Sequence, residues 1–178
     1  MPGVRNPHLA VLSDRVAVGW VLENQRIAFP EPRYKHQFRR FVVDDTLYLY
    51  TTRGCFKNPA QDQGRIVGKA TLTEDMVTAE HPVAFLERTM PYEAPIRVDL
   101  LAPVGEGVPL AGLADRLSCF PKPDHWAAYL RRSVVPLSQA DASLIDAALA
   151  PGARTLAECL EGYLERLRTR RHRSRSGS

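Results

Sequence analysis

A short polar segment follows a run of tyrosine and leucine near the middle of the chain. If the run LYLY is extended, Tyr48 and Tyr50 lie on one face of a strand. Thr51 and Thr52 then offer hydroxyl groups that donate and accept hydrogen bonds, and Arg53 offers a guanidinium that can bind a phosphate or a carbonyl. Aromatic faces beside fixed hydrogen-bonding groups are what recognition of an unstacked nucleobase requires.

The same residues also have structural explanations. Tyrosine and threonine are common in buried strands, and Asn58 before a proline is typical of a turn as well as being a candidate reader of a base edge. Cys55 lies between Arg53 and Lys57, which would lower the pKa of its thiol. A single cysteine without a neighbouring base is nevertheless more often inert than nucleophilic.

The elements that would position these groups can be predicted from hydrophobic periodicity. Residues 8–12 favour a strand, and Ser13 and Asp14 favour the N-cap of a helix over residues 15–28. Three further strands are expected at residues 46–52, 65–73 and 95–102. Within the strand expected at residues 65–73, Gly68 permits a bulge or a close backbone approach. Residues 53–64 connect the strands expected at residues 46–52 and 65–73, and this connector is long enough to indicate a functional loop.

Two helices are predicted near the C-terminus by their capping residues. Ser138 with Asp141 and Thr155 with Glu158 each have the spacing of a capping box. The second helix, residues 153–168, carries an apolar stripe: Leu156, Leu160, Tyr163, Leu164 and Leu167. This stripe is expected to dock on the rest of the domain or to form a homodimer with a second copy of the chain.

Most of the net positive charge lies at the C-terminal end. The chain has a formal charge of +4, and residues 169–178 hold four arginines and no acid, so the remaining body is neutral. A neutral body does not hold a long duplex through many phosphate contacts. The tail over residues 169–178 is expected to be disordered, and is either a nonspecific nucleic-acid contact or a segment foreign to the natural chain. Residues 33–40 form a second basic segment without acids.

Length and composition restrict the class of protein. A chain of 178 residues with 44% hydrophobic and 25% charged residues builds one core, hence a single domain. No apolar run approaches the roughly 20 residues of a membrane helix, and the start of the chain lacks the pattern of a signal peptide. A cytoplasmic location without a membrane partner is therefore expected. Cys55, Cys119 and Cys159 have no metal-site spacing, so neither a metal nor another cofactor is expected.

Four sequence blocks together resemble the EVE domain family of the PUA-like superfamily, which is related to YTH and ASCH domains. They are QRIAF, VVDDTLYLYTTRG, GRIVGKATLT and FPKPDHWAAYLRRSVVPLSQADASLIDAAL. The resemblance covers residues 8–150. It implies a β-rich α+β fold, a small and mostly antiparallel β-barrel flanked by short α-helices, to which this chain adds its C-terminal helix. The sequence departs from the family at Asp44-Asp45, where a Gly-Asp turn is expected, and in its longer loop after Tyr50.

The resemblance also implies a function, which is non-catalytic recognition of a nucleobase in DNA or RNA. The base is commonly a modified one, such as a methylated or hydroxymethylated cytosine, held in a pocket between the first helix and the barrel. The residues expected in this pocket are Ser13, Trp20, Arg26, Tyr48, Tyr50, Thr51, Thr52, Arg53, Asn58 and Trp126. The expected phosphate contacts are Arg33, Lys35, Arg39, Arg40 and Lys122.

Two alternative functions remain open from the sequence. Hydrolases of modified nucleosides in the ASCH family use lysine, threonine and glutamate, and this chain has Lys69, a threonine at 51 or 52, and Glu74 or Glu87. The binding function is preferred because the sequence has no nucleophile elbow and no phosphate-binding glycine loop. The other alternative is a dimeric module that binds a small ligand or interacts with a partner.

Overall fold

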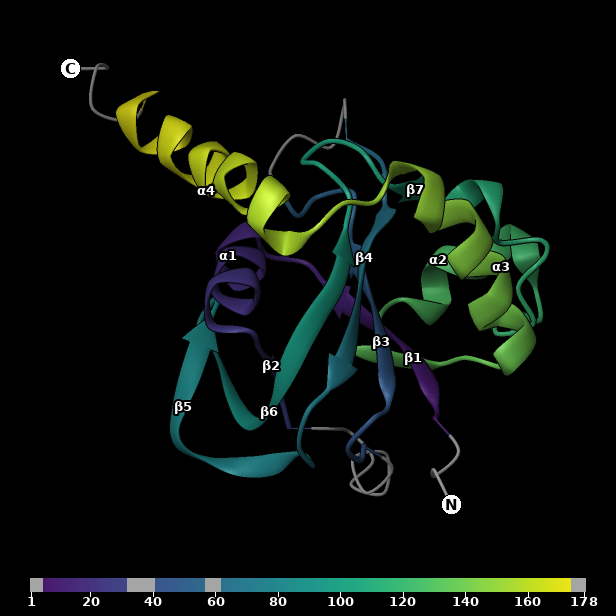
Figure 1. Cartoon of the computed structure of the whole chain (residues 1–178), viewed down its shortest axis with the longest axis horizontal. Coiled ribbons are helices and arrows are strands. Elements are labelled where there is room, and N and C mark those ends of the chain that lie inside the picture. Colours follow the sequence, from purple (N-terminus) through teal and green to yellow (C-terminus); the bar gives the residue numbers. More distant parts are fainter. Residues whose placement is uncertain (1–4, 32–40, 57–61, 174–178) are drawn as a thin grey trace.

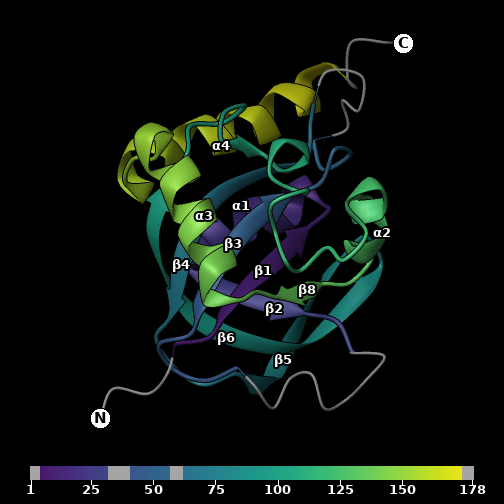
Figure 2. The ribbon, with the colours of Figure 1, turned by 90° about the vertical axis from the view of Figure 1, so that its right-hand side faces the viewer.

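The computed structural model describes residues 5–31, 41–56 and 62–173, with side chains as far as Arg168. The chain forms one curved, mixed sheet, a half-barrel with helices on both of its faces (Figures 1 and 2). The main path of the sheet is β2-β6-β4-β3-β1-β8, while β5 pairs with β6 and β7 pairs with β4. Strands β1 and β3 are parallel, and the other pairs are antiparallel.

The strands and helices alternate only in the first and last parts of the chain. The strands are β1 (Pro7–Leu12), β2 (Arg26–Phe29), β3 (Thr46–Thr51), β4 (Arg65–Leu72), β5 (Val77–Phe85), β6 (Arg88–Leu101), β7 (Val108–Pro109) and β8 (Val134–Pro136). The helices are α1 (Arg15–Asn24), α2 (Trp126–Tyr129), α3 (Gln139–Leu149) and α4 (Leu156–Arg173).

Strand β3 lies at the centre of the sheet and is buried on both faces. Leu47 and Leu49 point into one core, which α1 and α4 cover. Tyr48 and Tyr50 point into a second core, which α3 and the segment before it cover. The alternation predicted for this strand is therefore confirmed, and the two faces of β3 divide the interior into two layers.

Gly68 lies on β4 where the register with β3 shifts, between the pairs Leu49–Gly68 and Tyr50–Ile66. A Cβ atom at this position would lie 2.9 Å from the carbonyl oxygen of Leu100 on β6. The bulge and the close backbone approach predicted at Gly68 are both confirmed, and they explain why a residue without a side chain occupies a central strand.

The first helix is shorter than its periodicity predicted. Helix α1 ends at Asn24, and Gln25 adopts a left-handed conformation with a φ of 46°. The next four residues, Arg26–Phe29, form β2 and pair with β6. The prediction of a helix over residues 15–28 was wrong because the alternating Ile27 and Phe29 are buried by pairing with the sheet, and this tertiary contact outweighs helix propensity.

The β5–β6 hairpin was only partly predicted. Strand β6 begins at Arg88, well before the expected residue 95, and β5 was not predicted at all. Most of the residues of β5 are exposed and the strand contains Pro82, so it shows no alternation of apolar and polar residues. It pairs with β6 alone, which allows a proline in the strand.

Helix α4 packs on the rest of the same chain. The Tyr163 side chain is buried, and its hydroxyl donates a hydrogen bond of 2.7 Å to the carbonyl oxygen of Ala102 at the end of β6. Leu167 contacts α1 at Gly19. The helix then continues to Arg173 and projects beyond the body (Figure 1), so its backbone includes the start of the tail predicted to be disordered, while residues 174–178 lie outside the described part of the chain.

Both predicted capping boxes are confirmed. Ser138 Oγ accepts a hydrogen bond from the Asp141 amide at 3.0 Å, and the Asp141 carboxylate in turn accepts one from the Ser138 amide. At the start of α4, Thr155 Oγ1 accepts from the Glu158 amide at 3.2 Å, and the Thr155 amide donates to Glu158 Oε2 at 2.9 Å. These bonds to Thr155 lower the pKa of the Glu158 carboxyl.

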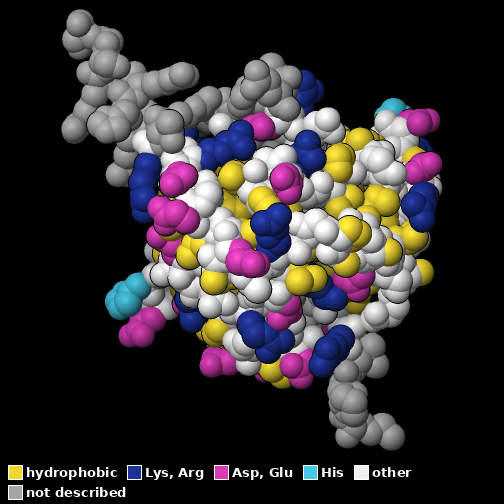
Figure 3. All heavy atoms as spheres, turned by 45° about the horizontal axis from the view of Figure 1, so that its top comes forward, with side chains coloured by type: hydrophobic (Ala, Val, Ile, Leu, Met, Phe, Trp, Pro, Cys, Tyr) yellow, Lys and Arg dark blue, Asp and Glu magenta, His cyan; other side chains and the backbone are white. Residues whose placement is uncertain are grey.

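The surface of the body carries charges of both signs. On the face shown in Figure 3, acidic and basic side chains are interspersed and apolar side chains are scattered between them. Within the described residues, no helix is long and apolar enough to cross a membrane.

Candidate functional site

A cavity of about 140 Å³ lies between the start of α1, strand β2 and the tip of the β5–β6 hairpin. Its apolar walls come from both the helix and the sheet, and include Leu12, Ala17, Val21, Phe29, Phe85 and Met90. Its polar lining is sparse and consists of Ser13, Asp14, Arg88 and Ser133. Apolar walls with a few polar groups are typical of a pocket for a small ring-shaped ligand.

Asp14 is the most buried of the four polar residues that line the cavity. It is the N-cap of α1, and its Oδ1 accepts a hydrogen bond of 3.1 Å from the amide of Val16. The residue is only 8% exposed, so its carboxylate is held in a fixed position at the boundary between helix and cavity. The sequence identified Asp14 as a capping residue, but it gave no signal that the same residue also lines a cavity.

The loop after β3 is hydrogen-bonded to the turn between β1 and α1. The amide of Thr52 donates to the carbonyl of Leu12 at 3.0 Å, and the amide of Arg15 donates to the carbonyl of Cys55 at 3.1 Å. The Cys55 amide closes the loop by donating to the carbonyl of Thr52. Two segments far apart in the sequence, the TTRGC loop and the Ser13-Asp14 turn, are therefore neighbours.

The predicted pocket residues of the first helix and of β2 lie in different environments. Ser13 lines the cavity. Trp20 packs edge-on against Phe85, with ring centroids 5.7 Å apart, and so supports a wall of the cavity from behind. Arg26 is paired with Glu93 of β6 at 2.7 Å, in the sheet pair that crosses the base of the cavity.

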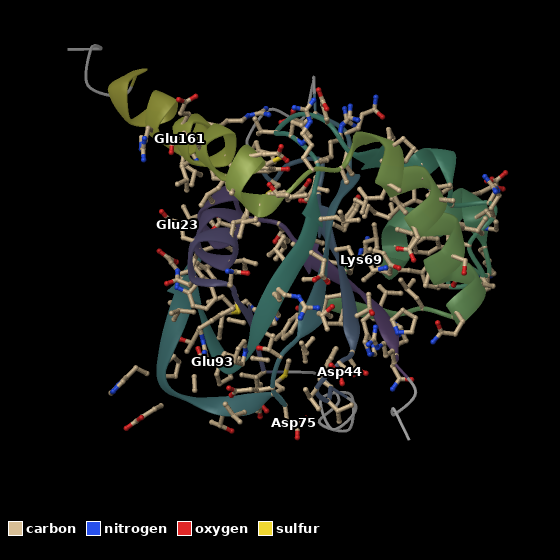
Figure 4. The ribbon with its side chains drawn as sticks, viewed as in Figure 1. Glu23, Asp44, Lys69, Asp75, Glu93 and Glu161 are labelled. Atoms are coloured by element: carbon tan, nitrogen blue, oxygen red, sulfur yellow. The ribbon has the colours of Figure 1, made fainter. Side chains whose placement is uncertain are left out.

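The two tyrosines of β3 point into the other core, away from the cavity. The Tyr48 hydroxyl donates a hydrogen bond of 2.7 Å to Asp146 of α3, and Lys69 Nζ lies 2.9 Å from the same carboxylate oxygen. Figure 4 shows Lys69 on the side of the sheet toward α3. Burial and the contact with Asp146 raise the pKa of Tyr48 far above its usual value. Burial alone raises the pKa of Tyr50 to about 12. Both hydroxyls stay protonated at physiological pH, and Tyr48 fastens α3 to the sheet.

The remaining predicted residues are divided between the loop and the far side of the sheet. Thr51 is buried, Thr52 is half-buried and Arg53 is exposed at the start of the loop. Trp126 packs against Phe120 in the second core, with ring centroids 6.3 Å apart. Lys122 is exposed shortly before it. Asn58, Arg33, Lys35, Arg39 and Arg40 lie outside the described residues.

The residues considered for a hydrolase lie on separate elements. Lys69 is engaged by Asp146 on the α3 side of the sheet. Glu74 is exposed just after β4, and Glu87 forms part of the turn between β5 and β6. No described contact joins Lys69 to either of these two glutamates.

Alkylation of Cys55 is expected to be slow in the folded protein. Burial raises the pKa of its thiol to about 12, and Asp14 and Asp62 add to this effect. The lowered pKa predicted for this thiol was therefore wrong, because burial disfavours the charged thiolate. A raised pKa leaves the thiol neutral until the pH approaches that value, so the reactive thiolate is scarce at neutral pH.

Iodoacetamide labelling followed by mass spectrometry can test this expectation. Cys55 should react at least roughly tenfold more slowly in the native protein than in urea. Cys119 is the internal control, because its thiol pKa is also raised to about 12 while its side chain is only half-buried. A native Cys55 that reacts as fast as the unfolded one would contradict the buried position.

Comparison with known proteins identifies the fold. No protein-family model matches the sequence, and no curated protein matches it. Protein PSPTO5229 from Pseudomonas syringae is similar, with a TM-score of 0.54 and 14% identity over 79% of this chain and 97% of that one. Rpa0253 from Rhodopseudomonas palustris has a TM-score of 0.53 and 17% identity over 82% and 94%. Human THYN1, in complex with 5-methylcytosine containing DNA, has a TM-score of 0.48 and 12% identity over 79% and 95%.

These comparisons and the observed topology confirm the predicted fold class. The chain has a β-rich α+β fold, in which a mixed half-barrel is flanked by helices, and it shares this fold with PSPTO5229 and Rpa0253. The matched region covers about four-fifths of this chain. At this level of identity the likeness concerns the fold, so the function has to be argued from the cavity and its side chains.

Proposed function

We propose that this protein binds nucleic acid by receiving one unstacked nucleobase in the cavity between α1 and the half-barrel. The observation that carries the proposal is the combination of apolar and aromatic walls with a buried, oriented carboxylate in one small cavity. Pockets for drug-sized ligands measure about 300 to 1,000 Å³, and 140 Å³ is suited to a single ring. A flipped base is bound in this way, by ring contacts on its faces and hydrogen bonds on its edge.

Asp14 supports a choice among the bases. An ionised carboxylate only accepts hydrogen bonds, so it favours a base whose edge donates from an exocyclic amino group. Cytosine combines such an amino group with a single ring, whereas the purines are larger and thymine and uracil lack the group. We therefore propose cytosine as the preferred base. The apolar neighbours Leu12 and Met90 suit a small substituent such as a methyl group.

Arginines at the rim supply candidate contacts for the flanking phosphates. Arg88 lines the cavity and is exposed. Arg131 and Arg132 are exposed immediately before Ser133, which also lines it. Guanidinium groups bind phosphate oxygens in a bidentate manner. These rim arginines join Lys122 and the arginines and lysine of residues 33–40 as proposed phosphate contacts.

Binding to matched DNA and RNA strands tests the proposal directly. The strands differ at one position, which carries cytosine, methylated or hydroxymethylated cytosine, or thymine. The wild-type protein should prefer a cytosine, and Asp14→Asn should weaken that preference by about tenfold, because a hydrogen bond to a charged group contributes roughly 1.5–3 kcal/mol. Asparagine also caps helices well, so the stability of α1 should be kept.

Two controls separate the cavity from general charge effects. Asp115→Asn removes one negative charge at an exposed position and should leave base preference unchanged. Changing the four arginines of residues 169–178 to glutamine should weaken binding to every strand alike and flatten its salt dependence. If all strands bind equally and the preference does not depend on Asp14, the cavity is not the binding site.

A further inference from the structure

The β5–β6 hairpin ends in a leucine that is unusually placed. Phe85 and Arg88 are the last paired residues, so Leu86 and Glu87 make a two-residue turn. Their φ angles are 50° and 59°, the left-handed values required by the turn that joins tightly twisted strands. Asparagine and glycine adopt these angles readily, whereas leucine does so at a cost in strain.

Leu86 is exposed although it is a large apolar side chain. It is 65% exposed and at the same time lines the cavity. The residue before it, Phe85, is buried and packs against Trp20 of α1, so the turn is anchored to the core directly below its tip. Figure 1 shows this end of β5 beside α1. The hairpin thus places an apolar side chain at the mouth of the cavity.

We propose that Leu86 is a wedge that enters the base stack of a nucleic-acid duplex and fills the space left by the base that moves into the cavity. This inference rests on the proposed function, because it requires a base to be received beside Leu86. A paired base must leave its stack before it can enter a pocket, which costs unstacking energy and leaves a gap in the duplex. Apolar side chains such as leucine fill such gaps by inserting between base steps.

The surroundings of Leu86 suit contact with a duplex. Arg88 follows two residues later, is exposed and lines the same cavity, so it can hold a phosphate next to the displaced base. A single strand has no stack to fill. The wedge therefore contributes to binding of a duplex and contributes little to binding of the same sequence as a single strand.

The test uses short DNA duplexes that carry methylated cytosine, unmodified cytosine or thymine at one position, the corresponding single strands, and a matched RNA duplex. A fluorescent adenine analogue beside the cytosine reports unstacking. Leu86→Asn removes the apolar side chain and suits the left-handed turn, so the hairpin should remain folded. Leu86→Met is the conservative variant that should keep the wedge. Val77→Asn is the matched control, because Val77 is 52% exposed near the other end of β5.

The expected result is selective loss of duplex binding. Leu86→Asn should weaken duplex affinity about tenfold and abolish the fluorescence increase, while its affinity for single strands stays within about twofold of wild type. Leu86→Met and Val77→Asn should behave as wild type. The DNA and RNA duplexes show which polymer is bound.

Two other outcomes overturn the inference and are distinguishable. In the first, the protein still prefers cytosine in single strands, but Leu86→Asn changes the affinities for duplex and single strand equally or changes neither. The wedge is then wrong and the base pocket stands. If the wild-type protein shows no preference for cytosine in any strand, the proposed function fails and the wedge fails with it.

Discussion

Replacing Tyr163 by alanine is expected to lower the free energy of unfolding by about 4 kcal/mol. The side chain is 1% exposed and belongs to the core that α1, α4 and the sheet share. Its removal would leave a large cavity between α4 and the end of β6. It would also remove the hydroxyl that donates a hydrogen bond to the Ala102 carbonyl. Urea denaturation followed by circular dichroism gives the measurement.

Tyr163→Phe is the control for the hydroxyl. It keeps the ring and removes only the 2.7 Å hydrogen bond, so it should cost about 1 kcal/mol. If Tyr163→Ala costs no more than Tyr163→Phe, the ring does not support the core and α4 contributes little to the stability of the domain.

The predicted cost also bears on the homodimer, because an apolar stripe of α4 that stabilises its own domain is not free to pair with a second copy of the chain. The homodimer stays a prediction that sedimentation can test.

Replacing Asp141 by alanine is expected to cost about 3 kcal/mol. The carboxylate is 1% exposed and completes the capping box of α3. It also accepts hydrogen bonds from the Ser118 amide at 2.7 Å, the Ser118 hydroxyl at 2.9 Å and the Cys119 amide at 3.2 Å. Alanine would leave these partly buried donors without their carboxylate partner and would release the segment before α2 from α3.

Thermal and urea unfolding of two variants would separate these contributions. Ser118→Ala removes the contacts of the Ser118 hydroxyl with Asp141 and Ser138, keeps the backbone contacts of Asp141, and should cost about 1 kcal/mol. Asp141→Ala should cost clearly more, since it removes the bond from the Ser138 amide to the carboxylate together with the contacts to the backbone of residues 118 and 119. Equal losses for the two variants would show that the contacts to the backbone of residues 118 and 119 contribute nothing to stability.

The elements that were predicted correctly are those whose signal is local. Strand β3 follows from its alternation, and both C-terminal helices follow from capping residues three positions apart. The end of α1 was missed because it depends on pairing of β2 with a strand more than sixty residues later, which no local pattern records. The turn of Leu86 and Glu87 was missed because it lacks the asparagine and glycine by which such hairpins are recognised.

The candidate site was harder to predict than the fold. Alternation established that Tyr48 and Tyr50 share a face, but it could not establish which face of β3 the cavity lies on. Asp14 was interpreted as a cap because a single carboxylate cannot be assigned two roles from sequence. The cavity is assembled from β1, α1, β2 and the β5–β6 hairpin, and the distances between these parts are set only when the sheet has formed.

The position of β1 in the sheet has a consequence for how the chain acquires its structure. This first strand lies between β3, with which it is parallel, and β8, which follows more than 120 residues later in the sequence (Figure 2). Both neighbours are made after it during synthesis, and the second only after most of the domain has emerged. Such distant pairings carry a large loop-closure cost, so we expect refolding in roughly milliseconds to seconds rather than microseconds. Until β8 arrives, β1 presents an unpaired edge, and the newly made chain is then most exposed to aggregation.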